Sequence, residues 1–214
     1  MSQKTAGNLR QEQAAATRRK LLESAQRLFA EKGYEGTSVR MINRSVNLAD
    51  GLLYHYFQGG KKEIFETVIR ENIKQIMDAL DAREKMEEYV NMPMEQVLEY
   101  TYCNFMQVID KYLDFIRMMF RENEVREFIT KEEMRRFSGN RYPWLPPLLC
   151  HKIEAGEIRH MDFEMAAMMV NSVLMNYVLA KVVGIDHNKL EDTKWRKRLI
   201  DYQVSIWMEP KSKD

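Results

Sequence analysis

Residues 17–69 read TRRKLLESAQRLFAEKGYEGTSVRMINRSVNLADGLLYHYFQGGKKEIFETVI, and the apolar spacing in this stretch decides the fold. A single apolar stripe predicts a helix from about Thr17 that ends at Lys32-Gly33. Thr37 is placed to cap a short helix that turns Val39, Ile42 and Val46 inward. A tight turn at 46–48 leads into a second short helix, over about 49–56. A long helix then begins at Lys61.

Two short helices joined by a tight turn are the arrangement in which a helix-turn-helix protein inserts its second helix into the major groove of DNA. Asn47 occupies the turn, and Asn is the non-glycine residue that best tolerates the left-handed φ that such a turn requires. Leu53 and Phe57, at i and i+4, are expected to anchor the second helix to the first helix of the domain.

The same stretch resembles the N-terminal domain of the TetR family of bacterial transcriptional regulators. The residues that carry the resemblance are Ala25, Leu28, Phe29, Gly33, Tyr34, Thr37, Val39, Ile42, Leu53, Tyr54, Tyr56, Phe57 and Lys61. The resemblance covers about residues 15–70 and implies a sequence-specific DNA-binding regulator. Three positions depart from the family pattern: Asn43 replaces a small residue, Ala49 replaces a Ser or Thr cap, and Asp50 replaces a common Lys or Arg.

The predicted DNA-binding residues are Thr37, Arg40, Asp50, Leu52, Tyr54, His55, Tyr56 and Lys61. The phenol groups of Tyr54 and Tyr56, together with Arg40 and Lys61, are suited to contact DNA phosphates. The backbone N–H groups expected to be exposed at 59–61 are suited to the same role. Asp50, Leu52 and His55 are the candidates for base contacts. Asp50 repels phosphates, although a carboxylate can accept a hydrogen bond from cytosine N4. For His55 the alternative is an exposed ring with no role.

Composition extends the helical prediction to the whole chain of 214 residues, because 9 Gly and 5 Pro are too few for an all-β fold. We therefore expect an all-α protein: a three-helix helix-turn-helix domain over 1–60, with 1–12 as a loose arm, and a helical regulatory and dimerisation domain over 61–214. Residues 1–65 carry a net charge of +5 and residues 66–214 a net charge of −4. A basic head on an acidic body fits a nucleic-acid binder, although ordinary charge scatter fits as well.

The body is rich in aromatic residues and methionine, which suits an irregular apolar cavity or simply a helical core. A pocket for a small hydrophobic effector is what the family resemblance implies. Its predicted lining is Tyr102, Cys103, Phe105, Met106, Phe120, Trp144, Met169 and Tyr177. Helices are expected over 94–120 with a bend near Asp110, over 122–137, over 163–183 capped by Asp162, and over 190–208.

Residues 163–183 are apolar on two faces, so one face needs a partner. With the last helix this pattern resembles the family's dimer interface, which predicts a homodimer on a (pseudo)palindromic DNA operator. No catalytic constellation, metal cluster or cofactor motif is visible, so we predict no enzyme, no cofactor and no metal. The polar groups within 163–183 and the polar N-terminus predict no membrane span and no signal peptide, and hence a cytoplasmic protein.

The sequence thus favours a DNA-binding transcriptional regulator, a repressor released by a small apolar ligand. The alternative is a helical module that binds small molecules or proteins and has only non-specific affinity for DNA. The departures at Asn43 and Asp50 are the support for that alternative.

Overall fold

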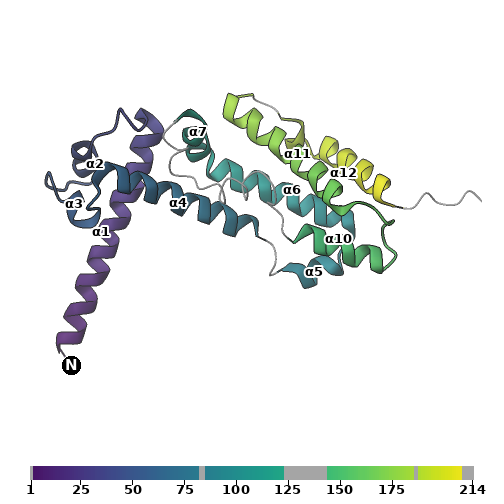
Figure 1. Cartoon of the computed structure of the whole chain (residues 1–214), viewed down its shortest axis with the longest axis horizontal. Helices are drawn as coiled ribbons and strands as arrows, with labels where there is room; N and C mark the ends of the chain where they lie inside the picture. Colours follow the sequence, from purple (N-terminus) through teal and green to yellow (C-terminus); the bar gives the residue numbers. More distant parts are fainter. Residues whose placement is uncertain (1, 82–84, 123–143, 186–187, 209–214) are drawn as a thin grey trace, which may run out of the picture. The chain divides into compact units, whose positions relative to one another are not determined.

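A computed structural model describes residues 2–81, 85–122, 144–185 and 188–208 (Figure 1). These residues form helices and turns, and no strand occurs among them, which confirms the predicted all-α class. The chain divides into two compact units. The first holds the residues up to Lys74 and those that begin at Asp114, and the second holds Gln75–Leu113 and the described residues from Trp144 onward. The first division falls between Lys74 and Gln75, inside the helix Gly60–Leu80. The domain boundary predicted between 60 and 61 stays a prediction.

The first unit contains α1 (Ser2–Lys32), α2 (Val39–Ser45), α3 (Leu53–Tyr56), the first part of α4 (Gly60–Leu80) and most of α7 (Leu113–Arg121). Its core is centred on apolar side chains with no exposed surface: Leu21, Ala25, Phe29, Ile42, Leu53, Phe57, Ile64, Phe65 and Ile69. The apolar stripe predicted for the first helix is therefore the side that packs into this core.

The predicted loose arm at 1–12 is wrong, because α1 already begins at Ser2. The stretch from Leu9 to Ala16 is exposed, so burial does not hold it in a helix. Its alanines, glutamines, arginine and glutamate are strong helix formers, and they extend a helix that the core has already nucleated. An apolar stripe is thus not needed for the exposed end of a long helix.

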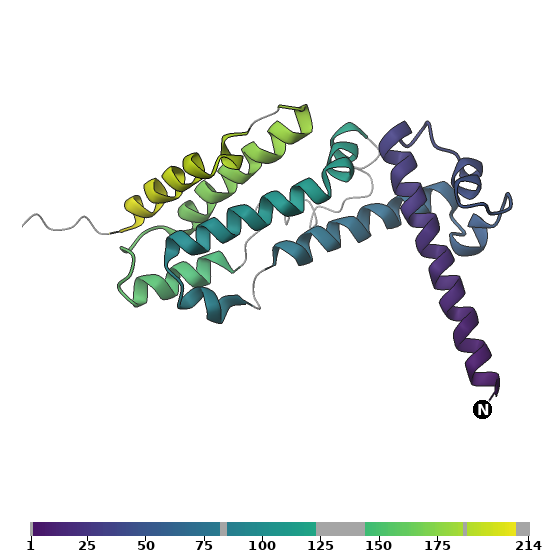
Figure 2. The ribbon, with the colours of Figure 1, turned by 180° about the vertical axis from the view of Figure 1, so that it is seen from behind.

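The second unit contains the end of α4, α5 (Met86–Val90), α6 (Met94–Lys111), α10 (Leu145–Glu154), α11 (Phe163–Val183), a 3₁₀ turn η2 (Lys189–Glu191) and α12 (Thr193–Trp207). α6 packs against α12 and α11, and α10 packs against α11 and α5. Figures 1 and 2 show α11 and α12 side by side along α6 from opposite sides.

Most predicted boundaries in this unit agree with the structure. α6 ends at Lys111 and α7 begins at Leu113, which confirms the break expected near Asp110. The side chain of Asp162 accepts hydrogen bonds from the N–H groups of Glu164 and Met165, so it caps α11 as predicted. The last helix begins at Thr193 rather than at Leu190, because Asp192 caps it and Leu190 belongs to η2. The helix predicted over 122–137 lies almost entirely outside the described residues.

One described helix, Phe163–Val183, is long and apolar enough to cross a membrane by length and composition. About 39% of its most apolar window is buried against other helices of this chain. A core helix of a soluble protein passes the same test, so length and composition do not by themselves indicate a membrane span.

Candidate nucleic-acid interface

The helix-turn-helix is formed by α2, the segment 46–52 and α3. Ser38 is the N-cap of α2, and its hydroxyl accepts a hydrogen bond of 3.2 Å from the N–H of Met41. The prediction that Thr37 is this cap is therefore wrong. Thr37 is buried, with its hydroxyl 2.8 Å from the carbonyl oxygen of Gly33 and 3.1 Å from that of Leu28. Its side chain secures the loop between α1 and α2, which argues against direct contact with DNA.

The turn after α2 has the predicted conformation. Asn47 has φ 57°, in the left-handed region. The carbonyl oxygen of Asn43 accepts hydrogen bonds from the N–H groups of Val46 and Leu48, at 3.2 and 2.9 Å. The turn thus closes on the last turn of α2, and Asn47 supplies the backbone conformation that a β-branched residue could not adopt without strain.

The recognition helix is shorter than predicted, because α3 spans Leu53–Tyr56 instead of beginning near Ala49. Gly51 has φ 97°, which interrupts a right-handed helix. The N–H groups of Leu52 and Tyr54 bond to the carbonyl oxygens of Ala49 and Gly51, three residues earlier, so this segment is a pair of turns. Leu53 and Phe57 have no exposed surface, which confirms that they anchor the segment to the core.

The predicted base-reading and phosphate-reading side chains of this segment lie at or near the surface. Tyr54 is 51% exposed, His55 is exposed, and Leu52 and Tyr56 are half-buried. The rings of His55 and Tyr56 pack edge to face with centroids 5.2 Å apart. Their contacts with DNA stay predictions, but four side chains within five residues are available for them.

Carboxylates accompany the groups that were predicted to hold phosphates. Arg40 Nε lies 3.1 Å from Asp50 Oδ2. Lys61 Nζ lies 4.1 Å from the centroid of the Tyr34 ring and 3.9 Å from Glu35 Oε2. The sequence did not reveal these pairs, because nothing in the spacing of Arg40 and Asp50 shows that a turn brings them together.

Two of the three N–H groups expected to be free for phosphates at 59–61 already donate hydrogen bonds within the chain. The N–H of Gly59 donates to Glu63 Oε2 at 2.7 Å, and the N–H of Gly60 donates to the carbonyl oxygen of Phe57 at 2.9 Å. Gly60 has φ 63°, and a Cβ there would lie 2.8 Å from the Tyr54 ring. Glycine at this position thus lets α3 and the start of α4 approach closely.

Asn43 departs from the family pattern and is also unusual in the structure. It has no exposed surface, and neither Oδ1 nor Nδ2 has a hydrogen-bond partner. An unpaired buried amide costs free energy, since both groups lose their bonds to water on folding. The side chain of Asn43 therefore lowers the free energy of unfolding relative to an apolar side chain of similar size.

Of the residues predicted to line an effector pocket, four are buried in the core of the second unit. Tyr102, Phe105, Trp144 and Tyr177 are at most 2% exposed and belong to the core. The hydroxyl of Tyr102 donates to Gln203 Oε1 at 2.6 Å, and that of Tyr177 to Asp110 Oδ1 at 2.9 Å. Phe120 and Met169 lie at the surface, while Met106 and Cys103 are half-buried.

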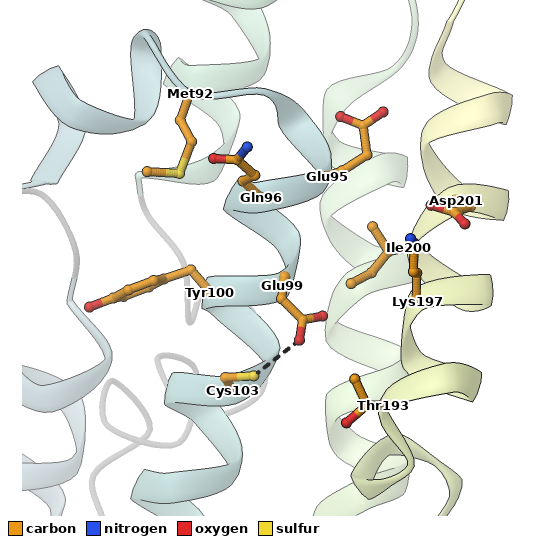
Figure 3. Close-up of a pocket in the computed structure, with 10 residues that line it drawn as sticks. All are labelled: Met92, Glu95, Gln96, Glu99, Tyr100, Cys103, Thr193, Lys197, Ile200 and Asp201. Atoms are coloured by element: carbon orange, nitrogen blue, oxygen red, sulfur yellow. Dashed lines mark hydrogen bonds between the residues drawn. The ribbon is translucent and has the colours of Figure 1, made fainter.

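A cavity of about 470 Å³ does lie in the second unit, between α6 and α12, and Cys103 is the predicted residue that lines it. Figure 3 shows its lining: Met92, Glu95, Gln96, Glu99, Tyr100, Cys103, Thr193, Lys197, Ile200 and Asp201. Thr193, Lys197 and Ile200 extend from α12 toward α6, and Glu99 and Cys103 lie opposite them.

One ion pair joins α6 and α12 beside this cavity. The guanidinium of Arg196 donates from Nη2 to Glu99 Oε1 at 2.7 Å and from Nε to the same carboxylate at 3.0 Å. These hydrogen bonds hold the pKa of Glu99 below its ordinary value. The thiol of Cys103 donates to Glu99 Oε1, and burial raises the pKa of this thiol. Glu99 is thus ionised and Cys103 is a neutral thiol at neutral pH. Among the described residues, no group of His, Cys, Asp or Glu is placed to hold a metal ion.

Comparison with known proteins shows which protein family the first unit is similar to. Residues 21–68 match the family model described as bacterial regulatory proteins, tetR family. The HTH-type transcriptional repressor AcnR of Corynebacterium efficiens is 34% identical over 64 residues, which is 30% of this chain and 34% of AcnR. The chain thus matches about a third of the length of such curated relatives.

Solved structures extend the likeness to the rest of the fold. A tetR-family transcriptional regulator from Mesorhizobium loti superposes with a TM-score of 0.68 at 17% identity, over 91% of this chain and 98% of that one. The transcriptional regulator FadR from Bacillus subtilis, in complex with stearoyl-CoA, gives 0.56 at 20% identity, over 89% and 97%. At these identities the likeness shows a shared fold: a helix-turn-helix unit followed by a helical body.

Proposed function

Because the chain belongs to the tetR family of bacterial regulatory proteins, we propose that it is a sequence-specific DNA-binding repressor that a small apolar ligand releases. The observation that carries this proposal is the helix-turn-helix itself. A left-handed Asn47 closes the turn, buried Leu53 and Phe57 anchor α3, and Tyr54 and His55 remain exposed beside them. Since DNA is the target, we place the protein in the cytoplasm.

Selection from a random duplex library tests this function. The purified chain is expected to enrich one (pseudo)palindromic sequence and to bind it in a gel shift far more tightly than random duplex at the same salt concentration. Weak binding without any enriched sequence would instead favour the alternative, a helical module with only non-specific affinity for DNA.

A homodimer through α11 and α12 is the second part of the proposal. Large apolar side chains on these helices are exposed in the single chain: Met165 is 56%, Met168 62%, Leu179 47% and Tyr202 66% exposed. An apolar face of this kind is normally covered by a partner. A two-fold axis would place one recognition segment in each of two successive major grooves, which explains why a (pseudo)palindromic operator is expected.

Met168→Glu tests this interface, because it adds a charge to the apolar face without touching the core. Sedimentation is expected to show a monomer that has lost operator binding. Leu9→Glu is the matched control, since Leu9 is 56% exposed on α1. A Met168→Glu protein that remains dimeric would place the interface elsewhere. Truncation before Leu190 removes α12 and is expected to give an aggregated or monomeric product.

The cavity between α6 and α12 supports the proposed small apolar effector. Its volume of about 470 Å³ lies in the usual range for small-molecule sites, and Met92, Cys103 and Ile200 give it apolar walls. A ligand there changes DNA affinity only through its differential affinity for two conformers of the protein.

Nile red, an uncharged apolar dye, is a suitable probe of this cavity. Cys103→Trp is expected to reduce dye binding by filling the space. Cys150→Trp is the matched control, because Cys150 is exposed on α10 and does not line the cavity. Equal dye binding by the wild type and both variants would remove this cavity from the proposal.

A further inference from the structure

We propose that Asp50, Glu35 and Glu63 act as internal competitors for DNA phosphates and so weaken the sequence-independent part of DNA binding by the helix-turn-helix. This inference rests on the proposed DNA-binding function and concerns the same surface. Each carboxylate lies against a group that would otherwise hold a phosphate: a guanidinium, an ammonium and a backbone N–H.

The pair of Arg40 and Asp50 is closer than the pair of Lys61 and Glu35. Arg40 projects from α2, and Asp50 lies in the turn that precedes α3, with Nε and Oδ2 3.1 Å apart. Both side chains are more than half exposed, so water and salt reach them and the pair adds little to folding stability. Its effect on an approaching polyanion is larger, because the pair presents no net charge where Arg40 alone would present one positive charge.

Glu35 and Glu63 repeat the arrangement at the start of α4. Glu35 Oε2 lies 3.9 Å from Lys61 Nζ, and Tyr34 supports the same ammonium from its ring face. Glu63 Oε2 accepts the hydrogen bond of the Gly59 N–H at 2.7 Å. Glu63 therefore places a negative charge at the helix N-terminus, where N–H groups and the helix dipole would favour a phosphate.

The consequence for DNA binding follows from the origin of the two kinds of binding free energy. Non-specific affinity comes almost entirely from cations that displace counterions from the DNA phosphates. Base readout depends on side chains that reach base edges, here Leu52 and His55, because Asp50, the third candidate for a base contact, is paired with Arg40. Weakening the phosphate contacts lowers the affinity for every sequence by a similar factor. The ratio of specific to non-specific affinity is kept, but random duplex is bound less tightly.

The test replaces the three acids by their amides, Asp50→Asn, Glu35→Gln and Glu63→Gln, in the whole chain of 214 residues. The amide of Glu63→Gln keeps an oxygen that can accept the Gly59 hydrogen bond, so charge is removed while the cap is retained. The matched control is Glu12→Gln, Glu23→Gln and Glu31→Gln. It removes the same charge from α1 and also breaks one exposed ion pair, between Glu23 and Arg19.

The measurement is the dissociation constant for a random-sequence duplex at 50 and 200 mM salt, by fluorescence anisotropy. Each cation that becomes free to contact a phosphate steepens the salt dependence by about 0.9 in log–log slope. In the proposed dimer, Arg40 and Lys61 of both protomers are freed, which makes four cations and adds about 3.6. Over a fourfold change in salt, the variant should therefore lose about 150-fold more affinity than the wild type loses. Its affinity at 50 mM salt should also exceed that of the wild type and of the control.

Two outcomes overturn the inference: a variant with the wild-type slope and affinity, or a control that changes as much as the variant. Circular dichroism of each protein confirms that the fold is kept. The proposed function is tested separately by the enrichment of one sequence by the wild type. Failure of that selection would leave the salt measurement on random duplex valid, so the two failures are distinguishable.

Discussion

Replacing Asn43 by Ala is expected to stabilise the protein, although most substitutions at buried positions destabilise. Asn43 has no exposed surface, and its side-chain amide has no partner. Leaving a buried polar group unpaired costs about 1–3 kcal/mol. Ala removes this cost, and it is also a better helix former than Asn by up to about 0.7 kcal/mol.

The opposing contribution is the void that the amide leaves. A void about the size of one water, about 30 Å³, costs about 0.7 kcal/mol at 24 cal/mol per Å³. This cost offsets the gain in helix propensity, so the net increase in the free energy of unfolding is about 1–3 kcal/mol. The backbone carbonyl of Asn43, which accepts the bonds from Val46 and Leu48, is unchanged by the substitution.

Asn72→Ala is the matched control, because Asn72 is also buried in the first unit but its amide is fully engaged. Its Nδ2 donates to Gln26 Oε1 at 3.1 Å and to the carbonyl oxygen of Val68 at 2.9 Å. Removing it leaves Gln26 without this partner, so we expect a loss of about 1 kcal/mol or more. The two Asn→Ala variants should therefore shift stability in opposite directions.

The assay is urea unfolding of the full-length protein followed by far-UV circular dichroism, at one fixed protein concentration because the protein is proposed to be a dimer. A gain of 1–3 kcal/mol also raises Tm by at least about 2 °C for a chain of this size. If Asn43→Ala lowers the midpoint as Asn72→Ala does, the reasoning is refuted, since Asn43 must then make a stabilising contact.

Three further predictions concern the turn, the body and base readout. Asn47→Ala is expected to cost about 1 kcal/mol in urea unfolding and Asn47→Gly much less, because φ at this position is 57°. Arg196 lowers the pKa of Glu99, so ionised Glu99 stabilises the protein above its unfolded pKa, and this contribution is lost as pH falls through the folded pKa. Glu99→Gln should therefore be less stable than the wild type at neutral pH, and a pH series of thermal unfolding should show the difference shrinking in acid. His55→Ala should change preference at one base pair by about 1–3 kcal/mol. Lys61→Ala should weaken binding about equally on all sequences, because it leaves the charge of Glu35 unpaired near the DNA phosphates. Equal loss on all sequences from His55→Ala would remove it from base readout.

The parts of the fold that sequence predicted well are those that local sterics or burial decide. Asn47 was placed in a left-handed turn because few other residues tolerate that φ, and Leu53 and Phe57 were placed in the core because they are apolar at i and i+4. Both features depend on residues close together in the chain, and both are confirmed.

Two local predictions were wrong, for different reasons: the cap of α2 had two neighbouring candidates, and the start of α3 depended on the conformation of Gly51. Thr37 and Ser38 both carry hydroxyls suited to an N-cap, and the backbone geometry assigns the cap to Ser38 while Thr37 bonds inside the α1–α2 loop. Gly51 is compatible with a helix at a modest cost, and its left-handed φ appears only once the turn has been closed against α2. Sequence spacing does not distinguish these alternatives.

The effector pocket was predicted from the family resemblance, and the aromatic and methionine content that suits such a pocket does not say which side of a helix remains uncovered. Tyr102, Cys103 and Phe105 lie within one turn of α6, yet only Cys103 lines the cavity, because Tyr102 and Phe105 are buried in the core. The side of α6 that carries Glu99 and Cys103 is open toward α12, and the pair of Glu99 with Arg196, far along the chain, holds its edge.

Net charge, like composition, does not show which side chains the fold brings together, and for the charged residues this affects DNA binding. The net charge of +5 over residues 1–65 predicts attraction to DNA but not where the attraction acts. Asp50 and Glu35 are counted in that sum, and the fold brings each of them to a cation that was predicted to meet a phosphate. A cation already paired with a carboxylate has to exchange one anion for another before it contributes to DNA affinity. The affinity of this surface for DNA therefore depends on pairings between α2, the turn before α3 and α4, and no sum over the sequence contains them.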